Sequence, residues 1–181
     1  ISPAFDLLPV LFRKIEEQEE KLFRLTNEQQ NLLNFLGQKQ RACIEGVAGS
    51  GKTMLAQAQA EKFADAGKTV LFVCYNKTLA AWINDSIADE YKTLITVTHF
   101  HGLCAGWIRK AGMSFSPPSP SYLANEFWQD EAADSLMDAI DMVPEKFDAV
   151  IVDEGQDFYP NWWMPLEMIN SAGDAGAMYI F

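Results

Sequence analysis

The chain has 181 residues, of which 49% are hydrophobic and 22% charged, a balance typical of one globular domain with a buried core. The formal net charge of −11 at pH 7 excludes a uniformly basic surface, so any contact with nucleic acid must come from a local patch or from parts outside this chain. No uninterrupted apolar run is long enough to cross a bilayer, and the first residues do not read as a secretory signal, so we expect no membrane partner. The isolated cysteines argue against a disulfide framework and favour buried thiols in a reducing cytoplasm; they are Cys43, Cys74 and Cys104.

The first 25 residues predict a leader helix, with an apolar stripe on one side and glutamates on the other. We interpret this helix as the tail of an upstream region. A second helix is predicted from Thr26 to Leu36, and Gly37 ends it. Residues 26–181 then form one domain, and because residues 178–181 look like the beginning of a strand, we expect the chain to be a fragment of a longer protein.

A glycine-rich motif follows this second helix. It fits the pattern G-x-x-x-x-G-K-[ST], after a short apolar run at 42–44 and before a helix-favouring stretch at 54–66. Glycines let successive backbone N–H groups converge on phosphate oxygens, and the helix that follows adds a partial positive charge. The motif predicts a nucleotide site formed by Gly46, Val47, Ala48, Gly49, Ser50, Gly51, Lys52 and Thr53. Lys52 would reach the β- and γ-phosphates, and the Thr53 hydroxyl would bind Mg²⁺.

Strand and helix patterns alternate through the rest of the chain. Strands are predicted at 69–75, 94–98 and 149–153, and helices at 78–91, 100–111 and 122–142, with a proline-rich loop at 114–121. The run at 149–153 is continuously apolar, as in strands buried on both faces. This order predicts an α/β fold with a parallel sheet and helices on both of its faces.

Two carboxylates end the apolar strand, and they narrow the chemistry of the nucleotide site. Ligands bind at the carboxyl ends of strands in such sheets, so Asp153 would lie beside the glycine-rich loop and hold Mg²⁺ through water. Glu154 is placed to polarise a water for attack on the γ-phosphate. The pair therefore indicates hydrolysis of ATP, with a solvated acidic turn as the alternative.

The glycine-rich motif, the Asp-Glu-Gly-Gln-Asp box at 153–157 and two further stretches together resemble a superfamily 1 DNA helicase of the UvrD/Rep kind. The resemblance runs from Leu25 to the end and covers the first RecA-like domain only, which implies a P-loop NTPase fold. It implies that Gln29 reads the adenine edge, although Thr26 and Gln29 also satisfy a helix capping box. It also implies that Gln156 couples the γ-phosphate to the DNA-binding surface. The catalytic residues would then be Lys52, Glu154 and Gln156.

The two further stretches imply contacts with single-stranded DNA. Tyr75 and Asn76 stand in a segment similar to motif Ia, and 97–103 resembles motif Ic through Phe100, His101 and Gly102. His99 stands where the family usually has threonine, but we keep it among the expected contacts. A zinc site at the two histidines has no further ligands at suitable spacing. Trp162 and Trp163 favour packing over base stacking.

The resemblance also indicates what the chain lacks. The insertion that relatives carry before the acidic box is vestigial here, and a second RecA-like domain with its arginines would follow this segment. We therefore expect the 181 residues to bind ATP–Mg²⁺ and to hydrolyse it poorly, since an arginine finger contributes about 10³- to 10⁵-fold to turnover. Two functions stay open: a DNA helicase or translocase motor, and a non-motor ATP switch for a fused or partner domain such as a nuclease. An RNA helicase is a third.

Overall fold

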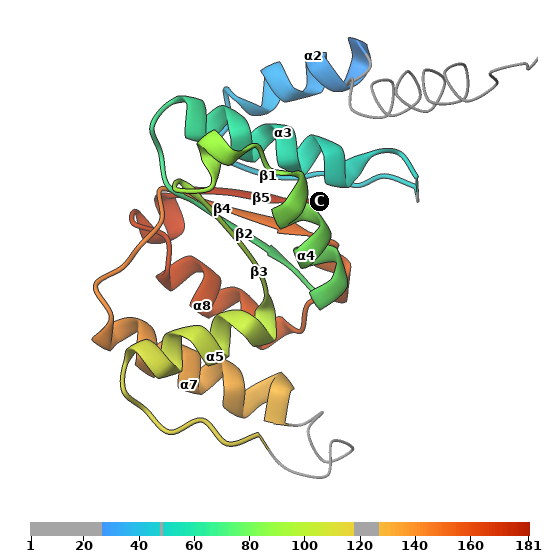
Figure 1. Ribbon diagram of the computed structural model, residues 1–181. Coiled ribbons are helices and arrows are strands. Elements are labelled where there is room, and N and C mark those ends of the chain that lie inside the picture. Colours follow the sequence, from blue (N-terminus) through green and yellow to red (C-terminus); the bar gives the residue numbers. More distant parts are fainter. Residues whose placement is uncertain (1–26, 48, 118–126) are drawn as a thin grey trace, which may run out of the picture.

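The computed structural model describes residues 27–47, 49–117 and 127–181 (Figure 1). The predicted leader helix and Thr26 therefore lie outside the described residues, as do Ala48 in the glycine-rich motif and the first part of the helix predicted at 122–142. No helix within the described part of the chain is long and apolar enough to cross a membrane.

The described residues form one sheet of parallel strands in the order β1-β5-β4-β2-β3, which confirms the predicted α/β class. In that order the strands are Arg41–Cys43, Ala177–Ile180, Ala149–Asp153, Val70–Cys74 and Ile95–His99. β5 lies between β1, which leads into the glycine-rich loop, and β4, which carries the acidic box. Cys74 is in register with both Asp153 and His99, so the ends of β4, β2 and β3 lie at one level.

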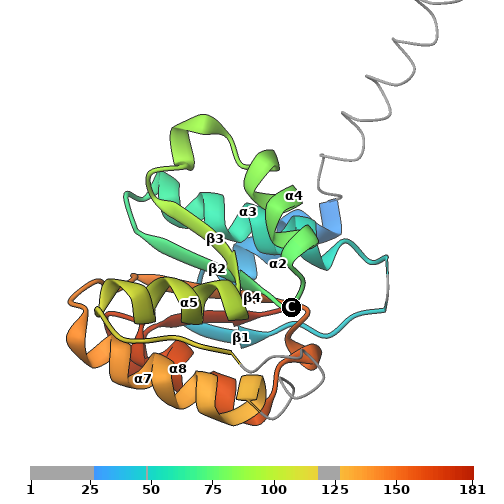
Figure 2. The ribbon, with the colours of Figure 1, turned by 60° about the horizontal axis from the view of Figure 1, so that its bottom comes forward.

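Helices cover both faces of this sheet (Figures 1 and 2). One face carries α2 (Asn27–Leu36), α3 (Lys52–Asp65) and α4 (Lys77–Ser86). The other carries α5 (Phe100–Lys110), α7 (Ala132–Met142) and α8 (Trp163–Met168). The five residues of β2 are all buried because helices pack on both of its sides.

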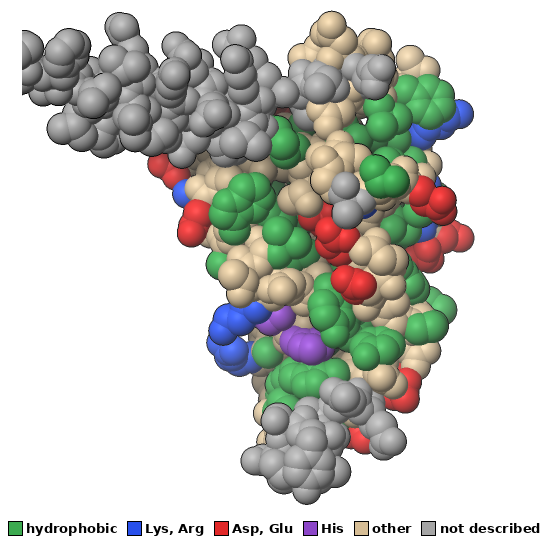
Figure 3. Space-filling view, turned by 90° about the vertical axis from the view of Figure 1, so that its right-hand side faces the viewer, with side chains coloured by type: hydrophobic (Ala, Val, Ile, Leu, Met, Phe, Trp, Pro, Cys, Tyr) green, Lys and Arg blue, Asp and Glu red, His purple; other side chains and the backbone are tan. Residues whose placement is uncertain are grey.

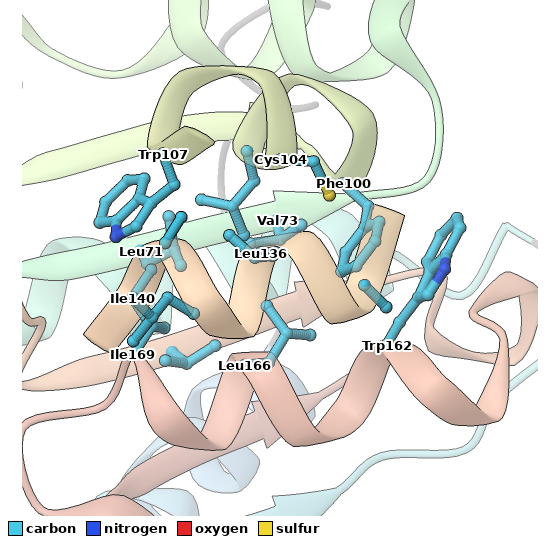
Figure 4. Packing of buried hydrophobic residues seen from close by; sticks show 14 of the residues in the cluster. Leu71, Val73, Phe100, Cys104, Trp107, Leu136, Ile140, Trp162, Leu166 and Ile169 are labelled. Atoms are coloured by element: carbon cyan, nitrogen blue, oxygen red, sulfur yellow. The ribbon is translucent and has the colours of Figure 1, made fainter. Parts of the chain in front are cut away.

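The two faces bury separate hydrophobic clusters. Val70 and Phe72 of β2 belong to the cluster under α3 and α4. Leu71 and Val73 alternate with them and pack against α5, α7 and α8, and Figure 4 shows them in one cluster with Leu136 and Leu166. This alternation follows from the period of two along a strand and fixes which face each helix covers.

The structure differs from the sequence prediction in two helices and one cysteine. α4 ends at Ser86, because Ile87 turns to extended backbone and buries its side chain, and a short 3₁₀ turn at Asp89–Tyr91 follows. The described part of the helix predicted at 122–142 begins with a π-helix, Phe127–Glu131, before α7. Cys74 and Cys104 are buried as predicted, but Cys43 is exposed because β1 is the edge strand of the described sheet.

Candidate functional site

A cavity of about 540 Å³ opens at the carboxyl edge of the sheet, where β1 and β4 end. Two segments far apart in the sequence line it: the glycine-rich loop with the start of α3, and the turn after β4. Its lining residues are Gly46, Gly49, Ser50, Gly51, Lys52, Thr53, Met54, Glu154 and Gln156. The structure thus brings together the loop and the acidic turn, as the sequence predicted.

The loop is shaped for an anion by its backbone. Gly49 and Gly51 have φ angles of 78° and 82°, in the left-handed region that favours glycine. α3 begins directly afterwards with no side-chain cap, so its first N–H groups remain free to bind phosphate oxygens. Lys52 donates from Nζ to the Gly46 carbonyl at 3.0 Å, which holds its charge across the loop. These groups fit the phosphates of a nucleotide.

Gln29 lies against the same loop. Its Nε2 donates to the Ser50 carbonyl at 3.0 Å, which ties the beginning of α2 to the glycine-rich loop. A Cβ on Gly51 would lie 2.5 Å from that nitrogen and would displace the Gln29 side chain, and the φ of 82° at this position also favours glycine. Recognition of adenine by Gln29 stays a prediction, and its capping partner Thr26 lies outside the described residues.

Asp153 ends β4 as a fully buried carboxylate. Neither of its oxygens makes a well-formed hydrogen bond within the described residues. Burial raises the pKa of Asp153, and the nearby charge of Glu154 raises it further, while the Thr53 hydroxyl and the Lys52 charge lower it. A buried, unsatisfied carboxylate beside a hydroxyl and a cavity is the donor set expected for Mg²⁺.

Thr53 and Asp153 would hold the metal only together with other oxygens. No group of three or more His, Cys, Asp or Glu side chains within the described ranges could hold a metal ion. Mg²⁺ commonly takes one or two protein oxygens and completes its shell with substrate phosphates and water. The site therefore fits Mg²⁺ that arrives with a nucleotide.

The turn after β4 is held in an unusual conformation. Glu154 has a φ of 55°, the only positive value among the non-glycine residues that the structure describes. Gln156 donates from Nε2 to Glu154 Oε2 at 2.5 Å, so the two predicted catalytic side chains meet at the cavity. Such strain persists where neighbouring structure enforces it.

Two contacts that sequence reasoning missed hold this turn in place. The Gly155 N–H donates to the Phe181 carbonyl at 2.9 Å, and a Cβ on Gly155 would lie 2.3 Å from Cγ2 of Ile180. The end of β5 therefore positions the acidic turn. Only the strand order could reveal this, because β5 lies some twenty residues further along the chain and nothing in its composition indicates the neighbour.

The residues predicted to contact DNA separate into exposed and buried ones. Tyr75 is exposed and Asn76 caps α4, its Oδ1 accepting from the N–H groups of Thr78 and Leu79. His99 and His101 are partly buried and visible at the carboxyl edge (Figure 3). Phe100 is wrong as a surface contact: its ring has no exposed area and stacks on Trp162 at 3.9 Å.

Trp162 is fully buried, which confirms the prediction that it packs in the core, and Trp163 is partly buried. Trp162 stacks between the first turn of α5 and the end of β2, where its ring contacts Phe100 and Tyr75. Figure 4 shows Trp162 beside Phe100, at one end of the hydrophobic cluster formed with α5, α7 and α8.

A family model described as an AAA domain matches residues 24–159, well over half of the chain. The matched segment contains the whole glycine-rich loop, the acidic turn, Tyr75 after β2 and His101 in the first turn of α5. No curated protein matches the chain significantly.

Proposed function

Because this chain belongs to the AAA domain family, whose members are P-loop NTPases, we propose that it is the ATP-binding domain of a DNA helicase or translocase. In this proposal, ATP hydrolysis drives movement along single-stranded DNA. The working protein is cytoplasmic, and a second RecA-like domain supplies the arginines that complete the ATP site.

In this proposal, the polar groups at and beside the cavity divide the work of hydrolysis. The loop N–H groups and Lys52 would bind the phosphates, and Thr53 and Asp153 would hold Mg²⁺, which would supply positive charge to neutralise the phosphates. Glu154 orients the attacking water and accepts its proton, because its carboxylate lines the cavity opposite the loop. To accept that proton, Glu154 must either break its hydrogen bond with Gln156 or use its other carboxylate oxygen.

The observation that carries the proposal is the Gln156–Glu154 hydrogen bond at 2.5 Å. It joins the residue predicted to polarise water to the residue predicted to sense the γ-phosphate. The same edge of the sheet carries the ends of β2 and β3 in register with Asp153. With neighbouring strands about 4.8 Å apart, His99 lies two strands, or roughly 10 Å, from Asp153. Coupling between ATP and a DNA strand bound at Tyr75 and His101 therefore needs only short-range contacts.

A second function is favoured by specific observations. The net charge is −11, Phe100 is buried, and the Asn76 side chain caps α4, so fewer groups are free to bind DNA than the motifs suggest. These features suit a non-motor ATP switch that controls a fused or partner domain. An RNA-dependent motor would have the same ATP site and would differ only in moving along single-stranded RNA.

The ATPase rate with and without single-stranded DNA separates these functions. The protein is tested with whatever sequence flanks these 181 residues in nature, next to the 181-residue chain alone, for which we expect ATP binding and poor turnover. The motor proposal predicts stimulation by single-stranded DNA, which Tyr75→Ala and His101→Ala reduce. Tyr91→Ala, at the opposite edge of the sheet, is the matched control and should keep the stimulation.

An absence of stimulation by single-stranded DNA in the natural protein would reject the motor and leave the switch. Stimulation by single-stranded RNA alone would reject DNA as the strand.

A further inference from the structure

The π-helix Phe127–Glu131 lies against the candidate DNA surface, and neither the glycine-rich loop nor the helicase-like motifs include it. Its Trp128 stacks on His101, with ring centroids 4.0 Å apart and an interplanar angle of 21°. π-helical turns are rare and frequently occur at functional sites. Trp128 is partly buried, so part of this residue remains accessible.

The π-helix is fastened to the chain just after the acidic box. The Trp162 indole donates from Nε1 to the Trp128 carbonyl at 2.9 Å. Asn161 donates from Nδ2 to Oδ1 of Asp130. Both anchors belong to the 3₁₀ turn Pro160–Trp162, which begins four residues after Gln156. A shift of the acidic turn on nucleotide binding would therefore reach Trp128 through few contacts.

Three aromatic side chains share this region. Tyr75 is 41% exposed and stacks on Trp162, with centroids 5.9 Å apart, while His101 meets the same indole edge-on at 5.5 Å. Burial lowers the pKa of His101 to about 4, so its ring is neutral near pH 7. Tyr75, His101 and Trp128, here called the aromatic strip, thus present uncharged ring surface beside one buried tryptophan.

Groups suited to phosphates lie next to the aromatic strip. Lys77 is exposed at the start of α4 and close enough to His99 to lower the pKa of that histidine, although burial of His99 has the larger effect. α5 begins at Phe100 with no side-chain cap, so no capping side chain binds its first-turn N–H groups. Figure 3 shows Lys or Arg side chains on one side of the two histidines and hydrophobic side chains below them. This local charge complements a phosphate backbone despite the acidic chain.

We propose that the aromatic strip stacks with unpaired bases of single-stranded DNA, and that Trp128 is a base-binding residue. The inference rests on the proposed motor function and extends it to a residue outside the helicase-like motifs. Aromatic rings serve this purpose because every base has a π-face, and base–aromatic stacking contributes about 1–3 kcal/mol per base. The anchors to Asn161 and Trp162 connect this base contact to the acidic turn.

Trp128→Ala tests the inference with little disturbance of the anchor, because Trp162 binds the Trp128 backbone carbonyl and not its ring. Affinity is measured by fluorescence anisotropy with labelled oligothymidine on the full chain, with ATP–Mg²⁺ present. We expect binding to weaken roughly 5- to 160-fold, which is the stacking energy above expressed as an affinity ratio. Trp128→Phe should restore most of it.

Trp82→Ala is the matched control, since Trp82 is 49% exposed on α4 and is not part of the aromatic strip. Binding should then be unchanged. The dependence of affinity on salt distinguishes stacking from general damage: removing a ring should lower affinity and keep the salt slope, because no phosphate contact is lost.

Unchanged affinity in Trp128→Ala would overturn the inference while the motor proposal stands. Tighter binding would also overturn it, because Trp128 would then be covering His101 and competing with bases. If the unmodified chain binds no single strand, the inference fails, while stimulation of the ATPase of the natural protein by single-stranded DNA decides the motor proposal separately. If it binds oligouridine and not oligothymidine, with the same loss in Trp128→Ala, stacking stands and DNA as the motor's strand is rejected.

Discussion

The two ends of β4 carry aspartates in opposite environments. Asp148 precedes the strand and accepts two hydrogen bonds from Thr69, from its N–H at 2.8 Å and from its hydroxyl at 3.0 Å. Asp153 ends the strand, fully buried, with no well-formed hydrogen bond to either oxygen within the described residues. Only the first four residues of β4 lie between the carboxylate that accepts hydrogen bonds and the one without a well-formed hydrogen bond.

This difference separates the structural edge of the sheet from its functional edge. At the amino edge, Asp148 joins β4 to the start of β2, and its hydrogen bonds to Thr69 stabilise the fold itself. At the carboxyl edge, the oxygens of Asp153 make no well-formed hydrogen bond within the described residues, and the strained Glu154 lines the cavity. Unsatisfied buried groups cost stability unless a partner binds, so they mark where the partner belongs.

Glu154→Gln should have the largest effect on the carboxyl edge. Removing the group that accepts the proton of water should lower ATP turnover by about 10²- to 10⁴-fold, while ATP binding persists. Steady-state turnover of the natural protein with single-stranded DNA measures this. Glu90→Gln, the same chemical change on an exposed 3₁₀ turn, is the control and should leave turnover unchanged. Comparable losses in both variants would contradict the assignment of Glu154.

Lys52→Ala should weaken ATP–Mg²⁺ binding about 10- to 100-fold, the range expected for loss of a charged hydrogen bond. Isothermal titration calorimetry on the 181-residue chain measures this. Folding should be retained, because Lys52 is only partly buried and bonds to its own loop. Lys68→Ala, on a lysine outside the cavity, should bind ATP normally. Unchanged affinity in Lys52→Ala would disprove the nucleotide site.

Asp153→Asn and Asp148→Asn should change stability in opposite directions. Without nucleotide, Asp153→Asn should raise the free energy of unfolding by about 1–2 kcal/mol, because burial disfavours the charged carboxylate that the substitution removes. Asp148→Asn should lower it by about 1 kcal/mol, because hydrogen bonds to a carboxylate weaken. Urea unfolding midpoints decide this. Equal signs for the two substitutions would contradict the distinction between the edges of the sheet.

The smallest expected effect is a pH dependence from the carboxyl edge. The pKa of His101 is lowered to about 4, so the unfolded chain takes up its proton first as pH falls. The stability that His101 contributes is therefore complete above about pH 6.5 and lost as pH falls towards 4. The raised pKa of Asp153 acts in the other direction, since its stability cost fades as pH falls through that pKa.

Because His101 and Asp153 change stability in opposite directions with pH, the contribution of His101 is measured as a difference in stability between two proteins. Unfolding midpoints of the unmodified chain and of His101→Gln should converge as pH falls from 6.5 to 4. Water screens a half-buried charge, so we expect the relative slope to stay below one proton. A gap that stays constant with pH would show that His101 has no lowered pKa.

Sequence patterns were sufficient for the strands that end in functional residues. Val70–Cys74 and Ala149–Asp153 are short apolar runs followed by polar residues, and both were predicted within one residue of their observed ends. The glycine-rich loop was equally clear, because its chemistry needs particular residues at fixed spacing. The helix predicted at 122–142 was less accurate in its described part, since the π-helix at 127–131 depends on contacts with Asn161 and Trp162.

The sequence by itself determined that this chain is an α/β P-loop domain, because local periodicity and the spacing of one loop encode both features. Only the tertiary structure decided which neighbours complete the site. Strand order brought Phe181 to the Gly155 N–H, and helix packing buried Phe100 while it left Tyr75 exposed. Trp128 came to lie on His101 in the same way. These contacts join residues distant in the chain, and no local pattern of side chains encodes them.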